Sequence, residues 1–271
     1  MFEFICHRLT EHVTQIVDPT EVSCFLVTGS EKALLIDTAV GFRGLADTVR
    51  GLTSLPVTVI LTHAHGDHAG GAGEFEEVYL HPADAPLRKI HGLEKRMGYA
   101  GAMLGPEAGL TEELFVPETD AEFKELFDGQ KFSLGGLTLR IIHVPGHTKG
   151  CCCVLLEEER SILYGDACNG NTLVMDEAST CISEYQRSLE YLKTFEDAYD
   201  TVYYSHGPAV GPRECLEDNL ILCDRILSGT DDAVPCEFMG RQAIRAARIQ
   251  GRFERVDGRS GNIVYSELTR R

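Results

Sequence analysis

Four potential metal ligands lie within six consecutive residues of this chain. They are His63, His65, Asp67 and His68, in the stretch THAHGDHAGG. Protonated imidazoles at this spacing would repel one another, and neutral ones would need hydrogen-bonding partners. A bound cation meets both demands, because neutral imidazole and carboxylate are normal ligands of zinc and its neighbours. The spacing therefore predicts a metal site.

Four further polar residues stand where predicted strands end. They are Asp37, His147, Asp166 and His206, and each follows a short apolar run. In a layered α/β fold, such strand ends can converge on one edge of the sheets. A histidine-rich surface loop that binds nothing would have no use for these partners, so we favour a built site.

The elements that must position these residues alternate along the chain, as is typical of an α/β protein. We expect strands at 22–28, 33–38, 57–62, 76–81, 131–134, 137–144, 150–157, 161–164, 201–205 and 262–266, and helices at 44–52, 183–195 and 214–227. Ser183 and Gln186 have the spacing of a capping box at the start of the second helix. No low-complexity linker interrupts the pattern, so we expect one domain over residues 1–271.

The segment 82–128 departs from this alternation, because helix-compatible pieces are interrupted by Gly and Pro. Two interpretations stay open: a helical cap over a site, which would control access, and an irregular surface excursion. His81 and His91 are the histidines that could line such a cap.

Composition limits the class of partner. With 25 Lys and Arg against 42 Asp and Glu, the formal net charge is −17. A nucleic-acid-binding protein needs a cationic surface to displace counterions from phosphates, so we expect a small-molecule substrate and no nucleic acid. The oligomeric state stays open.

The sequence lacks the segments that would direct the protein to a membrane or to secretion, so we expect a cytoplasmic protein. No apolar stretch approaches the roughly 20 residues that a membrane helix needs, and the first residues do not have the pattern of a signal peptide. The ten cysteines include the run Cys151, Cys152 and Cys153, but no C-x-x-C pair. Reduced thiols in a cytoplasmic protein are the simplest explanation, with the run buried in a strand.

In order and local context, these residues resemble the five motifs of the metallo-β-lactamase superfamily. The motifs are Asp37, the H-x-H-x-D-H run of His63, His65, Asp67 and His68, then His147, Asp166 and His206. The resemblance extends over about residues 20–210. It implies an αββα sandwich, in which two mixed β-sheets lie back to back with helices outside and metals at one edge.

The resemblance also implies a role for each residue. His63, His65 and His147 would hold a first metal ion; Asp67, His68 and His206 would hold a second, and Asp166 would bridge them. Asp67 and Asp37 form the catalytic set, Asp67 as a ligand and Asp37 as the residue that steadies the ligand loop. Two divalent ions are implied, most readily Zn²⁺, with Fe or Mn as alternatives.

By the same resemblance, the chain is a metal-dependent hydrolase in which a hydroxide shared by two metals attacks a small ester, thioester or lactone. Zinc β-lactamases typically lack either the equivalent of His68 or that of Asp166, so β-lactams are disfavoured. Quorum-quenching lactonases usually have a tyrosine shortly after the bridging aspartate, where this chain has Ala167 and Cys168. Thioesterases similar to glyoxalase II share the ligand set. The competing class is a persulfide dioxygenase with one iron.

Overall fold

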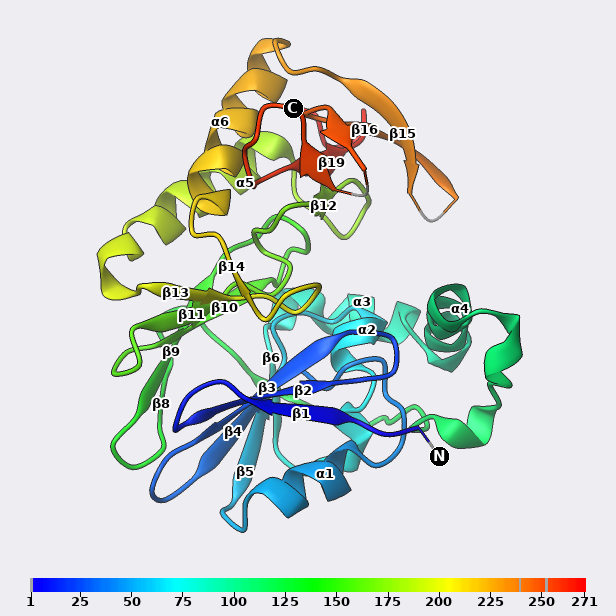
Figure 1. Cartoon of the computed structure of the whole chain (residues 1–271), viewed down its shortest axis with the longest axis vertical. Helices are drawn as coiled ribbons and strands as arrows, with labels where there is room; N and C mark the ends of the chain where they lie inside the picture. Colours follow the sequence, from blue (N-terminus) through cyan, green and yellow to red (C-terminus); the bar gives the residue numbers. More distant parts are fainter. Residues whose placement is uncertain (1, 239, 252) are drawn as a thin grey trace. The chain divides into compact units, whose positions relative to one another are not determined.

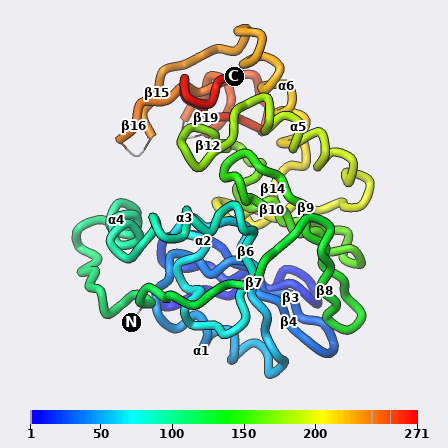
Figure 2. The backbone as a smooth tube through the Cα atoms, turned by 180° about the vertical axis from the view of Figure 1, so that it is seen from behind, coloured from blue at the N-terminus to red at the C-terminus, as the bar shows by residue number. Residues whose placement is uncertain are grey.

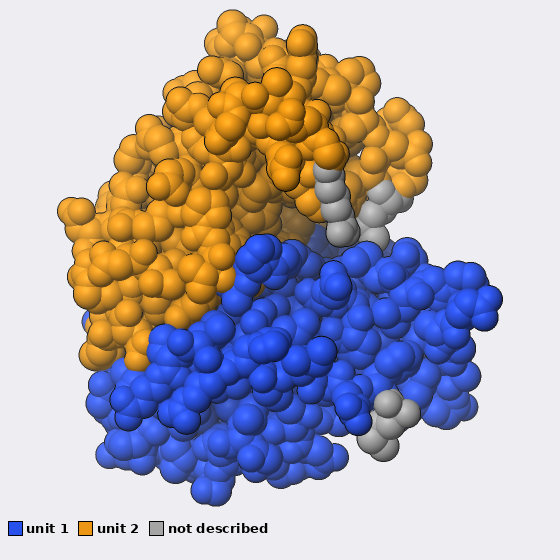
Figure 3. All heavy atoms as spheres, viewed as in Figure 1, with its two compact units in different colours: residues 1–140, 205–209 blue, residues 141–204, 210–271 orange. Residues whose placement is uncertain are grey.

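The computed structural model describes residues 2–238, 240–251 and 253–271. The chain packs into two compact units, which Figure 3 distinguishes by colour. The first contains residues 1–140 and 205–209, and the second contains residues 141–204 and 210–271.

A seven-stranded mixed sheet forms the framework of the first unit (Figure 1). Its strands follow one another in chain order: β1 (Ile5–Arg8), β2 (Val13–Val17), β3 (Ser23–Thr28), β4 (Ala33–Ile36), β5 (Val57–Ile60), β6 (Val78–Leu80) and β7 (Lys124–Glu125). Strands β1 to β4 pair antiparallel, and β4 to β7 pair parallel. The two central strands β3 and β4 are buried almost throughout, which accounts for their continuous apolar sequences.

The parallel pairing of β4 with β5 explains where the polar residues meet. Ile36 lies opposite Ile60 in the register of these strands. Both strands therefore end at the same edge of the sheet, and the residues that follow them, Asp37 and Thr62, are brought together there.

Helices connect the strands of this unit. They are α1 (Leu45–Leu52), α2 (Gly66–Ala69), α3 (Ala85–Ile90) and α4 (Leu93–Leu104), with short 3₁₀ turns at Ala72–Glu74, Pro82–Asp84, Pro106–Ala108 and Glu112–Leu114. The segment 82–128 is thus largely helical, and α4 packs against α2. A hairpin of β8 (Lys131–Ser133) and β9 (Thr138–His143) follows, and its turn contains Gly135 and Gly136, which both have positive φ, 80° and 82°.

The second unit combines several groups of strands with long helices (Figures 1 and 2). Strands β10 (Cys152–Leu156), β11 (Ser161–Leu163), β13 (Thr201–Tyr203) and β14 (Val210–Gly211) pair in that order. A four-stranded sheet has the order β12 (Thr172–Val174), β19 (Ile263–Tyr265), β16 (Arg241–Arg245) and β15 (Val234–Phe238). Strands β17 (Ile249–Gln250) and β18 (Glu254–Arg255) form a small hairpin.

Helices α5 (Ile182–Lys193) and α6 (Cys215–Ser228) lie side by side and cover the core of this unit, with a 3₁₀ turn at Glu196–Ala198. The buried face of α5 contains Tyr185, Leu189 and Leu192, as its periodicity predicts. The cysteine run is fully buried at β10, and all ten cysteines are free thiols. Among the described residues, no helix is both long enough and apolar enough to cross a membrane.

The start of α5 corrects one prediction. The helix begins at Ile182 with Cys181 as its N-cap, so Ser183 and Gln186 do not form a capping box. The first amide groups of the helix instead donate to main-chain carbonyls from the C-terminal end of the chain: Ile182 N to Thr269 O at 2.8 Å, and Ser183 N to Arg271 O at 3.2 Å. A distant segment thus satisfies the donors that a capping side chain would otherwise take.

Candidate metal centre

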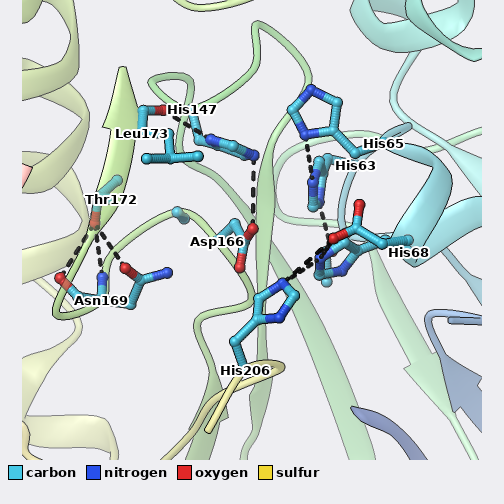
Figure 4. A network of polar contacts seen from close by, with 12 residues as sticks. His63, His65, His68, His147, Asp166, Asn169, Thr172, Leu173 and His206 are labelled. Carbon is cyan, nitrogen blue, oxygen red and sulfur yellow. Dashed lines mark hydrogen bonds and ion pairs between the residues drawn. The ribbon is translucent and has the colours of Figure 1, made fainter. Parts of the chain in front are cut away.

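Three of the predicted ligands converge within the first unit. Asp67 and His68 lie on the single turn of α2, and His206 lies in the returning segment 205–209. Their ligand atoms all lie within 4.8 Å of one another. The Nε2 atoms of His68 and His206 are 3.2 Å apart (Figure 4). Asp67 Oδ2 lies 3.5 Å from His206 Nε2 and 3.9 Å from His68 Nε2.

This triangle fits a small divalent cation. Nitrogen ligands about 2.05 Å from a tetrahedral zinc ion lie about 3.3 Å from each other. The three edges of the triangle, 3.2, 3.5 and 3.9 Å, are close to that value. A cation at the centre of the triangle would accept lone pairs from two imidazoles and one carboxylate. Zinc and the neighbouring metals bind this set of donors.

Backbone pairing brings His206 to this position. Ser23 N donates to Ser205 O at 2.9 Å, and an antiparallel bridge joins Val22 to His206. The start of β3 therefore holds the segment that follows β13, a contact between residues that are far apart in the sequence.

His63 and His65 form a second close pair in the same unit. His63 Nε2 lies 3.1 Å from His65 Nδ1, and the rings meet edge to face (Figure 4). His63 is fully buried, and its Nδ1 lies 3.1 Å from Thr62 Oγ1. We assign that contact as a hydrogen bond donated by Nδ1, which leaves the Nε2 lone pair directed at His65.

Asp37 organises both groups of histidines. Its carboxylate accepts hydrogen bonds from His68 Nδ1 at 2.8 Å, from Thr62 N at 2.7 Å and from the Thr62 hydroxyl. The residue is fully buried and has a left-handed backbone, with φ of 64°. An imidazole that donates Nδ1–H to a carboxylate keeps its Nε2 lone pair for a metal, so Asp37 has the position of a residue that orients ligands without binding the ion.

Two residues of the segment 82–128 also contact the ligand loop. The buried carboxylate of Asp84 accepts from Ala64 N at 3.0 Å, between two predicted ligands. His91 Nδ1 accepts from Gly66 N at 3.3 Å, and its ring lies 4.8 Å from that of His65. His81 instead caps the turn that follows it. Sequence reasoning missed Asp84, whose only signal is a carboxylate shortly after β6.

The second unit contains the other two predicted ligands. His147 Nε2 lies 3.6 Å from Asp166 Oδ2 (Figure 4). His147 Nδ1 donates to Leu173 O at 2.7 Å, which again leaves the Nε2 lone pair as the acceptor of the ring. The Ser179 hydroxyl donates to His147 O at 2.9 Å and fixes the turn.

Tyr185 supports both of these residues from α5. Its hydroxyl donates to Ala167 O at 2.8 Å, directly after Asp166, and its ring packs against Gly146, directly before His147. A Cβ at Gly146 would come within 2.1 Å of the ring, so the glycine is needed for this approach. The sequence placed Tyr185 on an apolar face but gave no sign of this role.

Two other residues near the motifs have structural roles. Burial raises the pKa of the Cys168 thiol well above its usual range, which favours the protonated thiol. Lys149 donates from Nζ to Glu177 O at 2.8 Å.

The structure thus forms the predicted site residues into two sets, each within one unit. The first unit brings together Asp37, His63, His65, Asp67, His68 and His206, and the second brings together His147 and Asp166. In both sets, the second ring nitrogen of a buried histidine is held by an oxygen acceptor. Such an arrangement is typical of metal sites.

Comparison with known proteins identifies one family. The family model of the metallo-beta-lactamase superfamily matches residues 17–206. An acyl-coenzyme A thioesterase, MBLAC2 of Gallus gallus, is 29% identical over 185 residues, covering 64% of this chain and 67% of the relative. An atrochrysone carboxyl ACP thioesterase of Claviceps purpurea is 28% identical over 191 residues; this match covers 69% of the present chain but only 51% of the relative.

Solved structures agree with this match. A metallo-beta-lactamase family protein from Thermus thermophilus is 25% identical and aligns with a TM-score of 0.55, covering 84% of this chain and 81% of that one. The predicted fold class, mixed β-sheets with helices in the metallo-β-lactamase fold, is confirmed. The predicted class of enzyme, a hydrolase of this superfamily, is confirmed as well.

Proposed function

The chain belongs to the metallo-beta-lactamase superfamily, and from this premise we propose that it hydrolyses acyl thioesters with the help of two divalent metal ions. The observation that carries the proposal is the triangle of Asp67, His68 and His206, whose edges match those of a tetrahedral site. The thioesterase relatives indicate the class of substrate.

We propose the full ligand assignment on the order of the family motifs. His63, His65 and His147 would hold one ion, Asp67, His68 and His206 would hold the other, and Asp166 would be a ligand shared by both. Zinc suits this set of imidazoles and carboxylates, and iron or manganese would fit the same donors.

When bound, two such ions would supply an acidified water as the nucleophile and a Lewis acid for the substrate carbonyl. The residues of the chain supply the positioning. Asp37 holds the proton on His68 Nδ1, and Leu173 O holds the proton on His147 Nδ1, so both Nε2 atoms can serve as ligands. Asp84 fixes the main chain between His63 and His65.

A thioester suits this site for a chemical reason. Its leaving group departs as a stable thiolate, which needs little proton donation, and the motif residues include no obvious general acid beyond the ligands. A small acyl thioester of coenzyme A or of a carrier protein is therefore the substrate class that we favour over lactones and β-lactams.

The test combines metal analysis with a substrate panel. Elemental mass spectrometry of the purified chain should find close to two zinc ions per polypeptide. The same preparation should hydrolyse acyl-coenzyme A thioesters faster than a lactone or a β-lactam, and a chelator should abolish the activity.

The variant Asp166→Ala tests the bridge, with Asp200→Ala as the matched control, because Asp200 is an exposed carboxylate paired with Arg160. We expect loss of two-metal loading and of thioesterase activity in Asp166→Ala only. Unchanged metal content and activity in Asp166→Ala would overturn the site. A single iron per chain with oxygen consumption on a persulfide would overturn the hydrolase proposal.

A further inference from the structure

A buried arginine joins the segment 82–128 to the metal-ligand loop. Arg96 of α4 is only 4% exposed. Its hydrogen-bond partners within the described residues are main-chain carbonyls: Nη1 donates to Val40 O at 3.3 Å and Gly70 O at 3.0 Å, and Nη2 donates to Val116 O at 2.7 Å. Burying a guanidinium is costly unless its donors are satisfied, so an arginine placed in this way needs all three segments in position.

Two of these carbonyls belong to the loops that carry site residues. Val40 lies in the loop after Asp37, and Gly70 directly follows α2, which carries Asp67 and His68. The two loops touch main chain to main chain: a Cβ at Gly70 would come within 2.1 Å of Val40 O. Arg96 Nη1 reaches both carbonyls and so ties this junction together.

The other end of α2 is held from the same stretch of the segment. His91 Nδ1 accepts from Gly66 N, the first amide of α2, at 3.3 Å. Residues 91–96 therefore contact α2 at its first amide and at the carbonyl just beyond its last residue. A helix of four residues has too few internal hydrogen bonds to fix its own orientation, so its direction depends on such external contacts.

The sequence of α2 is adapted to this contact. A Cβ at Gly66 would lie 2.7 Å from Arg96 Cγ. The φ of Gly66 is not positive, so the glycine is explained by the close approach of the arginine and not by its own backbone. Within α4, only Arg96 and Ala100 are buried, which makes Arg96 the main attachment of that helix.

We propose that residues 91–96 brace the ligand helix α2, with Arg96 as a positioning residue that sets the affinity of the Asp67, His68 and His206 site for its metal ion. The inference rests on the proposed metal-binding function. It adds that the segment 82–128 is a structural part of the metal centre, so substitutions that disturb the segment should change the affinity for the metal ion.

The primary test compares Arg96→Met with Arg88→Met. Arg88 is a matched control, because it lies in the same segment and also donates to two main-chain carbonyls, those of Thr119 and Ala121, and neither bond involves α2. Zinc affinities are measured by competition with a chromophoric chelator. We expect Arg96→Met to weaken one of the two ions by about 10- to 100-fold, the usual effect of losing a residue that orients ligands, and Arg88→Met to bind both ions as the wild type does.

A second pair of variants keeps the arginine. Gly66→Ala should weaken the same ion, whereas Gly98→Ala, a glycine of α4 with open space around it, should not. If the contact with Arg96 Cγ is the cause, Gly66→Ala should have little further effect in an Arg96→Ala background, which lacks that atom. The pair of glycine variants also tests the brace if Arg96→Met alone reduces the folded fraction.

The outcomes are distinct. Wild-type affinity for both ions in Arg96→Met, or in Gly66→Ala, would overturn the brace. Equal weakening of both ions together with a lower unfolding temperature of the metal-free protein would also overturn it, because that pattern indicates general destabilisation. Failure of the wild type to bind any metal would refute the proposed function instead.

Discussion

Replacing Asp37 by asparagine separates the charge of this residue from its shape. Asparagine tolerates the left-handed φ of 64° at this position, so the backbone should be retained. The carboxylate now accepts from both His68 Nδ1 and Thr62 N, but an amide offers only one oxygen and must present its NH₂ group to the other partner.

Either orientation of the amide has a cost. If the NH₂ group faces His68, Nδ1 must become an acceptor, and the proton moves to Nε2, the atom that would bind the metal. If the NH₂ group faces Thr62 N, two donors meet in a fully buried site. An unsatisfied buried donor costs about 1–3 kcal/mol, which corresponds to about 5- to 150-fold in affinity. We expect the ion at His68 to be weakened within that range.

The assay is a chelator-competition titration, with long-range ¹H–¹⁵N spectra of the histidine rings to report the tautomer. Asp47→Asn is the control, because Asp47 is an exposed carboxylate on α1 that pairs with Arg50. The control should bind both ions normally. The reasoning is wrong if Asp37→Asn keeps the wild-type affinity for both ions.

Three further predictions concern stability and reactivity. Tyr185→Phe should destabilise the protein by about 1–3 kcal/mol in urea unfolding, because Ala167 O loses a buried donor, whereas Tyr79→Phe, which loses a long bond to Glu77, should have little effect. A chelator should lower the unfolding temperature by about 10–20 °C in calorimetry, since metal at a hundred times its Kd contributes about 2.7 kcal/mol at each of the two proposed sites; an unchanged temperature would contradict metal binding to the folded state. Cys181 should be alkylated before Cys6 at neutral pH, as followed by peptide mass spectrometry. Burial raises the pKa of Cys181, but the hydrogen bonds with Ser183 and Glu184 lower it by more, so the net shift is downward. The pKa of Cys6 is raised by burial.

Much of the site could be predicted because its residues follow strands. Asp37 follows β4, and the H-x-H-x-D-H run follows β5, the strand parallel to it. Short apolar runs located both strands, and the parallel register then places their ends together. His68 and Asp37 therefore meet as expected, at 2.8 Å.

Other parts of the fold left little trace in the sequence. Strand β1 is exposed along its whole length, so it lacks an apolar alternation. Strand β15 contains a proline, and three of the five residues of β16 are polar. The start of α5 was misplaced because its amide groups are satisfied by carbonyls of Thr269 and Arg271, which lie more than eighty positions away in the chain. Local capping rules cannot detect such a partner.

Arg96 illustrates the same limit at the site itself. In the sequence, Arg96 lies among other polar residues and looks like a solvated arginine on a surface helix. Only the folded chain shows that it donates to three main-chain carbonyls. The sequence did contain a complementary signal, since Gly66 and Gly70 flank Asp67 and His68 where ordinary residues would fit a helix better. Each glycine leaves room for a neighbour, Arg96 Cγ in one case and Val40 O in the other. The glycines of the motif thus serve packing around the ligands, which explains how a four-residue helix can hold two of them in a fixed direction.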